Sequence, residues 1–411
     1  MFPLPEGWGP ARAVPTDSTS GTARPGVSID SDGVAYVLAY GGGDVTLTPF
    51  DEDSEWGTPV IRNEDATASR GVVAMNRDDQ GFAIWDGSED GVELLVARHD
   101  PEEGWLEPEP LGTTSGEVDD LALAISRTGK AIVVWVRPSA AIRAAHFDGS
   151  GWSEPVDVSP FEAYDLGFPS VGVDDEGRGL VIWRDVPEVG SFVAASRFDG
   201  TSWSAAENLC STTDEAGLQC YLQSLAMTGA GDAVAAMEVD YTLNAISYSP
   251  DAGWGSFEPL VEVERGSYGA HPSLGFDDAG NLLLIWREEI DDYDFRCQAL
   301  RRSAAGEWSE ITQLQPEPGE TDSKILAVAP DGRAIAFFGK GGSGSIPVGF
   351  WVSYYTPEGG WGEPALIDEG GNGAGADEVS AAINENGQAV VAWTRRDDSG
   401  AAVMARRFDP P

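Results

Sequence analysis

A tryptophan-centred pattern recurs eight times along the chain at nearly constant spacing, and this repetition limits the fold more than any other feature. Each Trp is followed by a short stretch of small and apolar residues, as in GWGEPALI around Trp361. The repeat length varies little, from the 47 residues between Trp105 and Trp152 to the 54 between Trp254 and Trp308. The remaining tryptophans of the series are Trp8, Trp56 and Trp203. Such self-similarity indicates a chain built from equivalent supersecondary units.

A tight-turn signal recurs with the same period. It is a group of four residues that ends in Gly, except in the second copy, where Asp79 takes that place. The copies occupy residues 30–33, 76–79, 126–129, 174–177, 228–231, 277–280, 329–332 and 384–387. The last position of such a hairpin turn requires a left-handed backbone, which Gly adopts freely and Asp tolerates. The apolar runs beside the turns are short, which favours strands over helices.

A period near 50 residues with four short strands per unit is typical of a β-propeller blade. The sequence therefore predicts an all-β fold, an eight-bladed β-propeller of four-stranded blades that forms one domain over residues 1–411. Seven complete blades are expected at residues 24–61, 68–111, 119–158, 167–209, 221–262, 270–314 and 323–367. The eighth joins residues 377–409 to a strand at residues 6–14, so that the N-terminal strand closes the ring and leaves no free sheet edge. A β-solenoid is the alternative, and it does not account for these complementary ends.

Two columns of residues predict how the blades pack. Five residues before the last residue of each turn the side chain is small, which suits an inner strand with little room. These residues are Ser28, Ala74, Ala124, Gly172, Ala226, Gly275, Ala327 and Ala382. Most second strands end in an aromatic residue or Met: Trp85, Trp135, Trp183, Met237, Trp286, Phe338 and Trp393. We interpret this second column as packing between blades and not as a stacking surface for ligand.

The longer and more variable loops are expected to gather on one face of the propeller, where binding chemistry is usually carried. Cationic, aromatic and titratable groups in or beside these loops are the candidate ligand-binding residues: Arg24, Arg70, Arg184, Tyr268, His271, Arg287, Tyr293 and Glu378. Because Arg matches planar carboxylate and sulfate groups, an acidic sugar is the first ligand class to test. His271 is also the best general acid–base candidate, with Tyr268 beside it. The alternative for His271 is a strand start whose imidazole only bonds a neighbouring loop.

Charge excludes some classes of partner. Against 69 Asp and Glu stand 25 Lys and Arg, for a formal net charge of -44. Such a field repels nucleic acid and anionic membranes, and no apolar run is long enough to span a membrane, so neither nucleic-acid binding nor membrane insertion is predicted. No cofactor is required by any motif. Calcium is the one candidate, because the segments 30–33, 51–55 and 174–177 present carboxylates in short turns. We expect a monomer.

Three cysteines bear on the compartment. Cys210 and Cys220 bracket one predicted loop between blades, and a disulfide there would favour an extracytoplasmic location, whether secreted, periplasmic or at the cell surface. A reduced pair in a cytosolic protein is the alternative. Cys297 is expected to be a buried thiol. Residues 1–5 carry no signal-peptide pattern, so we expect that peptide to be absent from this chain.

The segments FDGSGW (147–152) and FDGTSW (198–203), following a D-x-x-G turn and an apolar strand that ends in Trp, give the chain a resemblance to bacterial sialidase-like, or BNR-type, β-propeller repeat proteins. The chain departs from that family's S-x-D-x-G-x-x-W box, because His146 and Arg197 stand at the Ser position and the spacing is one residue short. The resemblance implies a propeller fold. For the enzymes of the family, the resemblance further implies three arginines that bind the substrate carboxylate, a Tyr–Glu nucleophile pair and an Asp that acts as acid and base. Nothing in this sequence ties its Arg residues into that set.

Two functions follow as hypotheses. The favoured one is a secreted or surface-associated binding propeller that recognises a glycan or protein through its loop-rich face, because no catalytic motif stands out. The alternative is a carbohydrate-active enzyme, either a sialidase-like hydrolase or a polysaccharide lyase, with its site at the axial mouth. Fold alone does not distinguish these two hypotheses.

Overall fold

The computed structural model describes residues 6–15, 25–41, 44–51, 55–63, 68, 70–87, 94–112, 118–137, 141–159, 166–185, 191–212, 220–262, 270–291, 294–315, 324–340, 349–369, 379–397 and 400–410. Every element within these ranges is a β-strand. In this part of the chain there is accordingly no helix long and apolar enough to cross a membrane. Contacts divide the chain into two compact units, Met1–Glu89 with Leu94–Glu109 and Phe276–Pro411, and Asp90–Glu93 with Pro110–Gly275.

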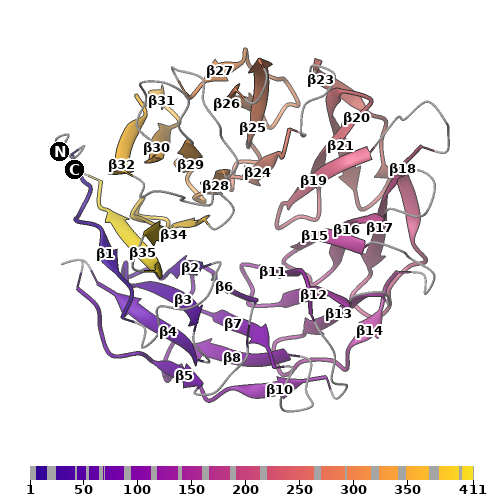
Figure 1. Ribbon diagram of the computed structural model, residues 1–411. Helices are drawn as coiled ribbons and strands as arrows, with labels where there is room; N and C mark the ends of the chain where they lie inside the picture. Colours follow the sequence, from indigo (N-terminus) through magenta and orange to yellow (C-terminus); the bar gives the residue numbers. More distant parts are fainter. Residues whose placement is uncertain are drawn as a thin grey trace. The chain divides into compact units, whose positions relative to one another are not determined.

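The strands form eight antiparallel sheets, and Figure 1 labels them in chain order. The first sheet contains β2 (Gly26–Ile29), β3 (Ala35–Gly41), β4 (Asp44–Phe50) and β5 (Ile61–Asn63). The second contains β6 (Gly71–Met75), β7 (Gly81–Asp86), β8 (Leu94–Asp100), β9 (Gly104–Trp105) and β10 (Glu109–Leu111). The third contains β11 (Leu121–Ile125), β12 (Ala131–Arg137), β13 (Ala141–Phe147) and β14 (Val156–Asp157). The fourth contains β15 (Leu166–Val173), β16 (Gly179–Asp185), β17 (Ser191–Phe198) and β18 (Glu207–Thr212).

The second half of the chain repeats this plan. The fifth sheet contains β19 (Cys220–Met227), β20 (Ala233–Val239), β21 (Thr242–Ser249), β22 (Gly253–Trp254) and β23 (Glu258–Glu262). The sixth contains β24 (Ser273–Phe276), β25 (Leu282–Asp291), β26 (Asp294–Arg302) and β27 (Thr312–Gln313). The seventh contains β28 (Lys324–Val328), β29 (Ala334–Lys340), β30 (Gly349–Thr356), β31 (Gly360–Trp361) and β32 (Ala365–Glu369). The eighth contains β33 (Val379–Ile383), β34 (Ala389–Asp397), β35 (Gly400–Phe408) and β1 (Arg12–Ala13).

Each sheet is one blade, and eight such blades in succession make an eight-bladed β-propeller, as the sequence predicts. In three blades the fourth strand is split into two segments that both pair with the third strand, which is why those sheets have five strands. The fourth-strand Trp lies at the start of this region and is paired with the end of the third strand, for example Trp203 with Phe198. Several first strands of successive blades contact one another within a unit, for example β2 with β6 and β15 with both β11 and β19, as expected for the inner strand.

The turn prediction is confirmed in all eight repeats. The seven glycines at the last turn position have φ between +78° at Gly129 and +98° at Gly231, and Asp79 has φ +57°. A left-handed backbone strains most side chains, and Asp is among the few that tolerate it. The exception in the second repeat therefore keeps the same turn geometry.

The two packing columns also behave as predicted. The second-strand residues are almost fully buried, since Trp85, Trp135 and Trp183 are 0 % exposed and Trp286 is 1 % exposed. The small column reflects close contact between neighbouring blades. A Cβ atom added at Gly172 would lie 2.6 Å from the Cβ atom of Met227 in the next blade, so a larger residue does not fit there.

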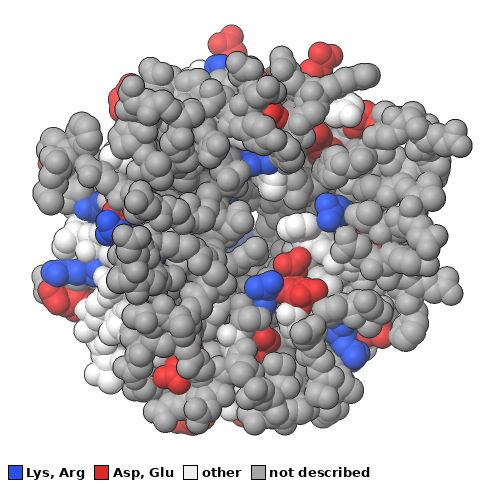
Figure 2. All heavy atoms as spheres, in the orientation of Figure 1, with Lys and Arg blue, Asp and Glu red and all other residues white. Residues whose placement is uncertain are grey.

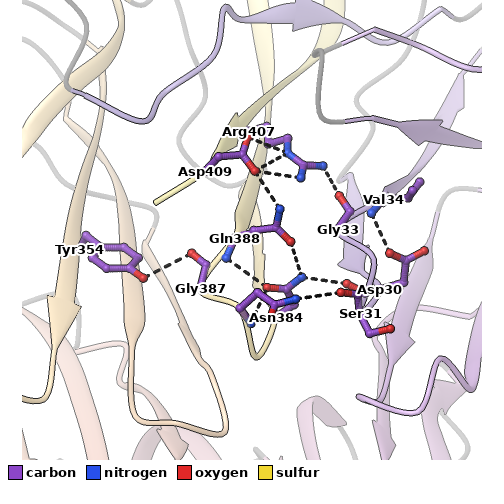
Figure 3. A network of polar contacts seen from close by, with 11 residues as sticks. Asp30, Ser31, Gly33, Val34, Tyr354, Asn384, Gly387, Gln388, Arg407 and Asp409 are labelled. Atoms are coloured by element: carbon purple, nitrogen blue, oxygen red, sulfur yellow. Dashed lines mark hydrogen bonds and ion pairs between the residues drawn. The ribbon is translucent and has the colours of Figure 1, made fainter. Parts of the chain in front are cut away.

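The N-terminal strand pairs with the C-terminal blade as predicted. Arg12 lies opposite Ala405 and Ala13 opposite Met404, and Trp8 forms a bridge with Phe408. The last blade also contacts the first one, as Figure 3 shows: Arg407, 1 % exposed, donates from Nη1 to the carbonyl oxygen of Gly33 and from Nη2 to Asp409, at 2.9 Å. Closure of the ring as a whole and the single-domain interpretation stay predictions.

Candidate functional site

Half of the predicted ligand-binding residues lie outside the described residues. These are Arg24, Tyr268, Tyr293 and Glu378, and their roles stay predictions. Of the other four, Arg70 and Arg287 belong to the first unit, and Arg184 and His271 belong to the second. The structure brings two of the arginines together with aromatic rings that the sequence analysis had not selected.

Arg184 lies beside Phe168 at one end of the fourth blade. The Arg184 guanidinium carbon is 5.1 Å from the centre of the Phe168 ring, a cation–π distance. The buried Nε of Arg184 has no hydrogen-bond acceptor among the described residues. Phe168 itself is 44 % exposed, unusually high for a Phe. A cation and an accessible aromatic ring therefore stand side by side at the end of β15 and β16.

A β-bulge places the Phe168 ring at this position. In the β15–β16 pairing, Gly167 lies opposite Arg184, and regular pairing resumes only at Ser170 opposite Ile182. Phe168 falls within this irregularity and has φ +53°. A left-handed backbone at a bulky residue costs about 1–3 kcal/mol and is concentrated at functional sites, as are bulges that re-aim a side chain. The backbone conformation that exposes the Phe168 ring to solvent therefore costs the protein stability.

An acidic residue of the preceding blade supports this conformation. The backbone N–H of Phe168 donates to Oδ2 of Asp120 at 2.9 Å. Both residues occupy the same position in their blades, nine residues before the last residue of the turn. Asp120 therefore fixes the backbone that carries the exposed ring.

His271 stands at that same repeat position in the sixth blade and also has a left-handed backbone, with φ +44°. The residue before it is fixed from the fifth blade, since the Ala270 N–H donates to Oε2 of the buried Glu238 at 2.9 Å. His271 is half-buried. Its prediction as an acid–base group stays a prediction.

The remaining two arginines are held mainly by their own blades. Arg287 is only 4 % exposed, and its guanidinium carbon is 4.5 Å from the centre of the Phe295 ring. Arg70 is half-buried, and its backbone N–H donates to Oδ1 of the buried Asp86 at 3.0 Å. Arg287 thus offers a ligand less of its surface than Arg184 does, although both occupy the same position in their repeats.

The turn carboxylates proposed for calcium are engaged within the protein. Oδ1 of Asp174 accepts from the N–H groups of Glu176 and Arg178, at 3.0 and 2.8 Å. Oδ1 of Asp30 accepts from Val34 at 2.7 Å, and burial raises the pKa of the Asp30 carboxyl. Within the described ranges no three His, Cys, Asp or Glu side chains gather as metal ligands would. Calcium binding stays a prediction.

The predicted disulfide is present. Cys210 and Cys220 are bonded, with a Cα–Cα distance of 6.3 Å that lies in the normal range. The bond joins β18 of the fourth blade to β19 of the fifth, within the second unit. Cys297 is a buried free thiol whose pKa burial raises to about 12.

Figure 2 shows how charge is distributed on one face of the molecule. Among the residues described there, Lys and Arg side chains occur singly among Asp and Glu side chains and do not merge into a basic patch. That nucleic acid is not a partner stays a prediction from the net charge.

Sequence reasoning missed Phe168 and Asp120 as site residues. Both belong to the series nine residues before the turn, which includes Arg24, Arg70 and His271. An aromatic residue among mostly polar residues at this position is the signal that identifies Phe168. Its bulge and its exposure were not visible in the sequence.

Comparison with solved structures bears on the fold of this chain and not on its function. A lectin from Burkholderia pseudomallei has TM-score 0.58 and 17% sequence identity, over 84% of this chain and 99% of the lectin. A variant of the NanB sialidase from Streptococcus pneumoniae has TM-score 0.44 and 9% identity, over 94% and 92%. A variant of the Aleuria aurantia lectin in complex with Fucα1-6GlcNAc has TM-score 0.42 and 14% identity, over 73% and 96%. No protein-family model and no curated protein sequence matches the chain.

Proposed function

We propose that this chain is a glycan-binding β-propeller that acts outside the cytoplasm and recognises an acidic sugar through the strand ends around Phe168 and Arg184. The observation that carries the proposal is the Phe168 ring, exposed at a bulge with a left-handed backbone and placed 5.1 Å from a guanidinium. Such a conformation persists only where the surrounding structure enforces it.

The chemistry of this pair suits a sugar with a negative group. The face of an aromatic ring packs against the apolar face of a pyranose, and the neighbouring guanidinium donates in a plane to a carboxylate or sulfate. Asp120 accepts from the backbone of Phe168 and holds the ring in place. The fold supports the proposal to the extent that lectin propellers and sialidase propellers share it.

The proposed location rests on the disulfide. The Cys210–Cys220 bond is of the type that persists in oxidising compartments and is rare in the cytosol. A surface-exposed or secreted protein also meets glycans directly.

A glycan array tests the proposal, with the wild-type protein and the variants Phe168→Ala, Arg184→Ala and Val156→Ala. Val156 is the matched control, because it is also 44 % exposed but lies on a fourth strand. We expect the wild type to bind acidic glycans, Phe168→Ala to weaken binding about tenfold or more, and Arg184→Ala to remove the preference for acidic glycans. Val156→Ala should bind as the wild type does.

Phe168→Gly separates a structural role from a binding role. Gly relieves the left-handed backbone, so this variant should be at least as stable as Phe168→Ala and still fail to bind. If Phe168→Ala and Arg184→Ala both keep the wild-type binding pattern, the site is not at these strand ends. If the wild type binds no glycan, the proposed function is wrong.

A further inference from the structure

A cavity of about 370 Å³ opens at the other end of the fourth blade, between it and the fifth blade. The fourth blade contributes Arg178, Arg197 and Trp203, and the fifth contributes Met227, Tyr248 and Pro250. These residues lie at or beside the short turns, whereas Phe168 and Arg184 lie at the opposite ends of the same strands. The volume is within the usual range for small-molecule sites.

Comparison between repeats shows why the cavity is there. Each fourth-strand Trp pairs with a residue near the end of the third strand, and in four blades the residue just before that partner lies at the junction with the next blade. In the third blade this residue is His146, whose ring lies 4.4 Å from that of Phe198 in the next blade. In the seventh blade it is Tyr354, whose ring lies 4.7 Å from that of Phe408. Tilted ring pairs therefore fill this position at both junctions.

At the junction of the fourth and fifth blades the corresponding pair is Arg197 and Tyr248, and it does not stack. Arg197 instead approaches Glu207 on its own outer strand, with 3.7 Å between Nε and Oε1. The same position at the junction of the sixth and seventh blades holds Arg301 and Tyr355, and the hollow there is only about 10 Å³. The junction with the cavity thus differs from these three other junctions, two with paired rings and one with a small hollow.

The carboxylates beside the cavity are satisfied by the protein. Asp174 is fully buried, and its Oδ2 accepts from Nε of Arg178 at 2.6 Å while its Oδ1 accepts from two backbone amides. Oδ1 of Asp199 accepts from the N–H groups of Thr201 and Ser202, both at 2.8 Å, and these bonds lower the pKa of the Asp199 carboxyl. Neither carboxylate has to find a donor on a ligand.

Hydrogen-bond donors remain available in the same space. Within the described part of the chain the Tyr248 hydroxyl has no hydrogen-bond partner, and the Arg197 guanidinium has only the long contact with Glu207. Trp203, Met227 and Pro250 add an apolar wall. The cavity therefore favours a ligand that brings acceptors and one apolar face.

We infer that this cavity binds a small six-membered ring that carries a carboxylate, with Arg197 as the group that holds the carboxylate. The guanidinium matches a carboxylate in geometry and charge, and the wall around Trp203 and Pro250 receives the ring. This site is separate from the proposed glycan site at Phe168 and does not depend on it. Glucuronate and benzoate share the chemistry and distinguish a sugar acid from an aromatic acid.

The test is calorimetric titration of the purified full chain with glucuronate, benzoate and the neutral control glucose. The variants are Arg197→Ala, Arg197→Tyr, the matched control Arg301→Ala, and Phe168→Ala. Arg197→Tyr should pack against Tyr248 as Tyr354 packs against Phe408, and so fill the cavity without loss of stability. We expect one of the carboxylates to bind the wild type, at least tenfold weaker binding in both Arg197 variants, and unchanged binding in Arg301→Ala.

Glu207→Gln provides a second readout that does not remove Arg197. Because Glu207 competes for the guanidinium, this variant should bind the carboxylate severalfold more tightly. The inference is overturned if neither carboxylate binds the wild type, if glucose binds equally well, or if Arg197→Ala binds as the wild type does. Binding lost in Phe168→Ala and kept in Arg197→Ala assigns the ligand to the strand ends at Phe168, which also overturns it and leaves the proposed function standing.

Discussion

Asn384 in the turn of the eighth blade donates from Nδ2 to the backbone carbonyl oxygen of Asp30 in the turn of the first blade, at 2.9 Å. The residues are 354 positions apart in the sequence. The Asn384 side chain also accepts from the N–H groups of Asn386 and Gln388, at 3.0 and 3.1 Å, as Figure 3 shows in part. One buried amide thus shapes its own turn and fastens the last blade to the first.

Asn384→Ala is expected to lower the free energy of unfolding by about 1–3 kcal/mol, because it leaves two turn amides without their partner and removes the bond between blades to the Asp30 carbonyl, which keeps only the Gly33 N–H of its own turn. Denaturant unfolding measures this difference. The control is Asn386→Ala, which removes an exposed bond to the Ser31 carbonyl, 2.9 Å long, and should cost less. Equal losses in the two variants would contradict the role given to Asn384.

Deletion of residues 1–14 should destabilise the protein and promote aggregation. The deletion exposes the outer edge of β35 and removes Trp8, which is 8 % exposed and stacks on Phe408 at 5.2 Å. It also removes the Gly9 carbonyl that accepts from Nε of Arg406 at 2.6 Å. We expect Tm to fall by on the order of 5 °C and light scattering to rise. Unchanged Tm and solubility would argue that β1 does not protect this edge.

Reduction of the Cys210–Cys220 bond should lower stability by about 2–3 kcal/mol, as expected for a short closed loop. The measurement is thermal unfolding with and without dithiothreitol. A Cys210→Ser, Cys220→Ser double variant should not respond to the reductant, whereas Cys297→Ser should respond as the wild type does, since Cys297 is a free thiol. A full response in the double variant would show that the reductant acts elsewhere.

Arg287→Ala should cost more stability than Arg184→Ala, although the two residues are equivalent in the repeat. Arg287 is 4 % exposed and covers the Phe295 ring, so its loss leaves a gap and unpaired neighbours, at about 2–3 kcal/mol. Arg184 is only half-buried, and we expect a loss below about 1 kcal/mol. Chemical denaturation compares the two. The reverse order would mean that Arg184 is structural and would weaken its assignment to the glycan site.

Stability should fall as the pH drops through the titration range of His146. Burial lowers the pKa of the His146 imidazole below its usual value, with a smaller opposing effect from Asp148. The folded state therefore favours the neutral ring, and the unfolded state takes up a proton first as the pH falls. The stabilisation is complete above the unfolded pKa, near 6.5, and is lost as the pH falls below it and through the lowered folded pKa.

Replacing His146 with Phe tests this dependence, because the Phe ring can keep the stack on Phe198 without titrating. We expect the Tm of the wild type to fall more steeply than that of His146→Phe over this range. Carboxylates elsewhere titrate in both proteins, so the difference between the two curves isolates His146. Parallel curves would assign the pH response to other groups.

Some of this architecture can be read from the sequence because it depends on short-range requirements that recur in every blade. The turn needs a residue that accepts positive φ, which explains both the seven glycines and Asp79. The buried second strand needs large apolar residues at its end, which explains Trp135 and Trp183. The spacing of Cys210 and Cys220 across one interblade loop was sufficient to predict their bond. The turn and strand signals recur from blade to blade, and the two cysteines lie at the ends of one short loop, so all of them can be recognised from local sequence.

The candidate sites depend on contacts that break the repeat, and only the tertiary structure decided them. The sequence shows Phe168 in a column of strand starts, but exposure of its ring depends on a bulge against β16 and on a hydrogen bond from Asp120, 48 residues away. Arg184 and Arg287 look equivalent in the sequence, yet burial separates them. His146 and Arg197 share one position, and whether a ring closes the junction or a guanidinium leaves it open depends on Phe198, Tyr248 and Glu207. Local sequence determines which strands and turns form, whereas the partner across the blade junction determines which side chains are left for a ligand.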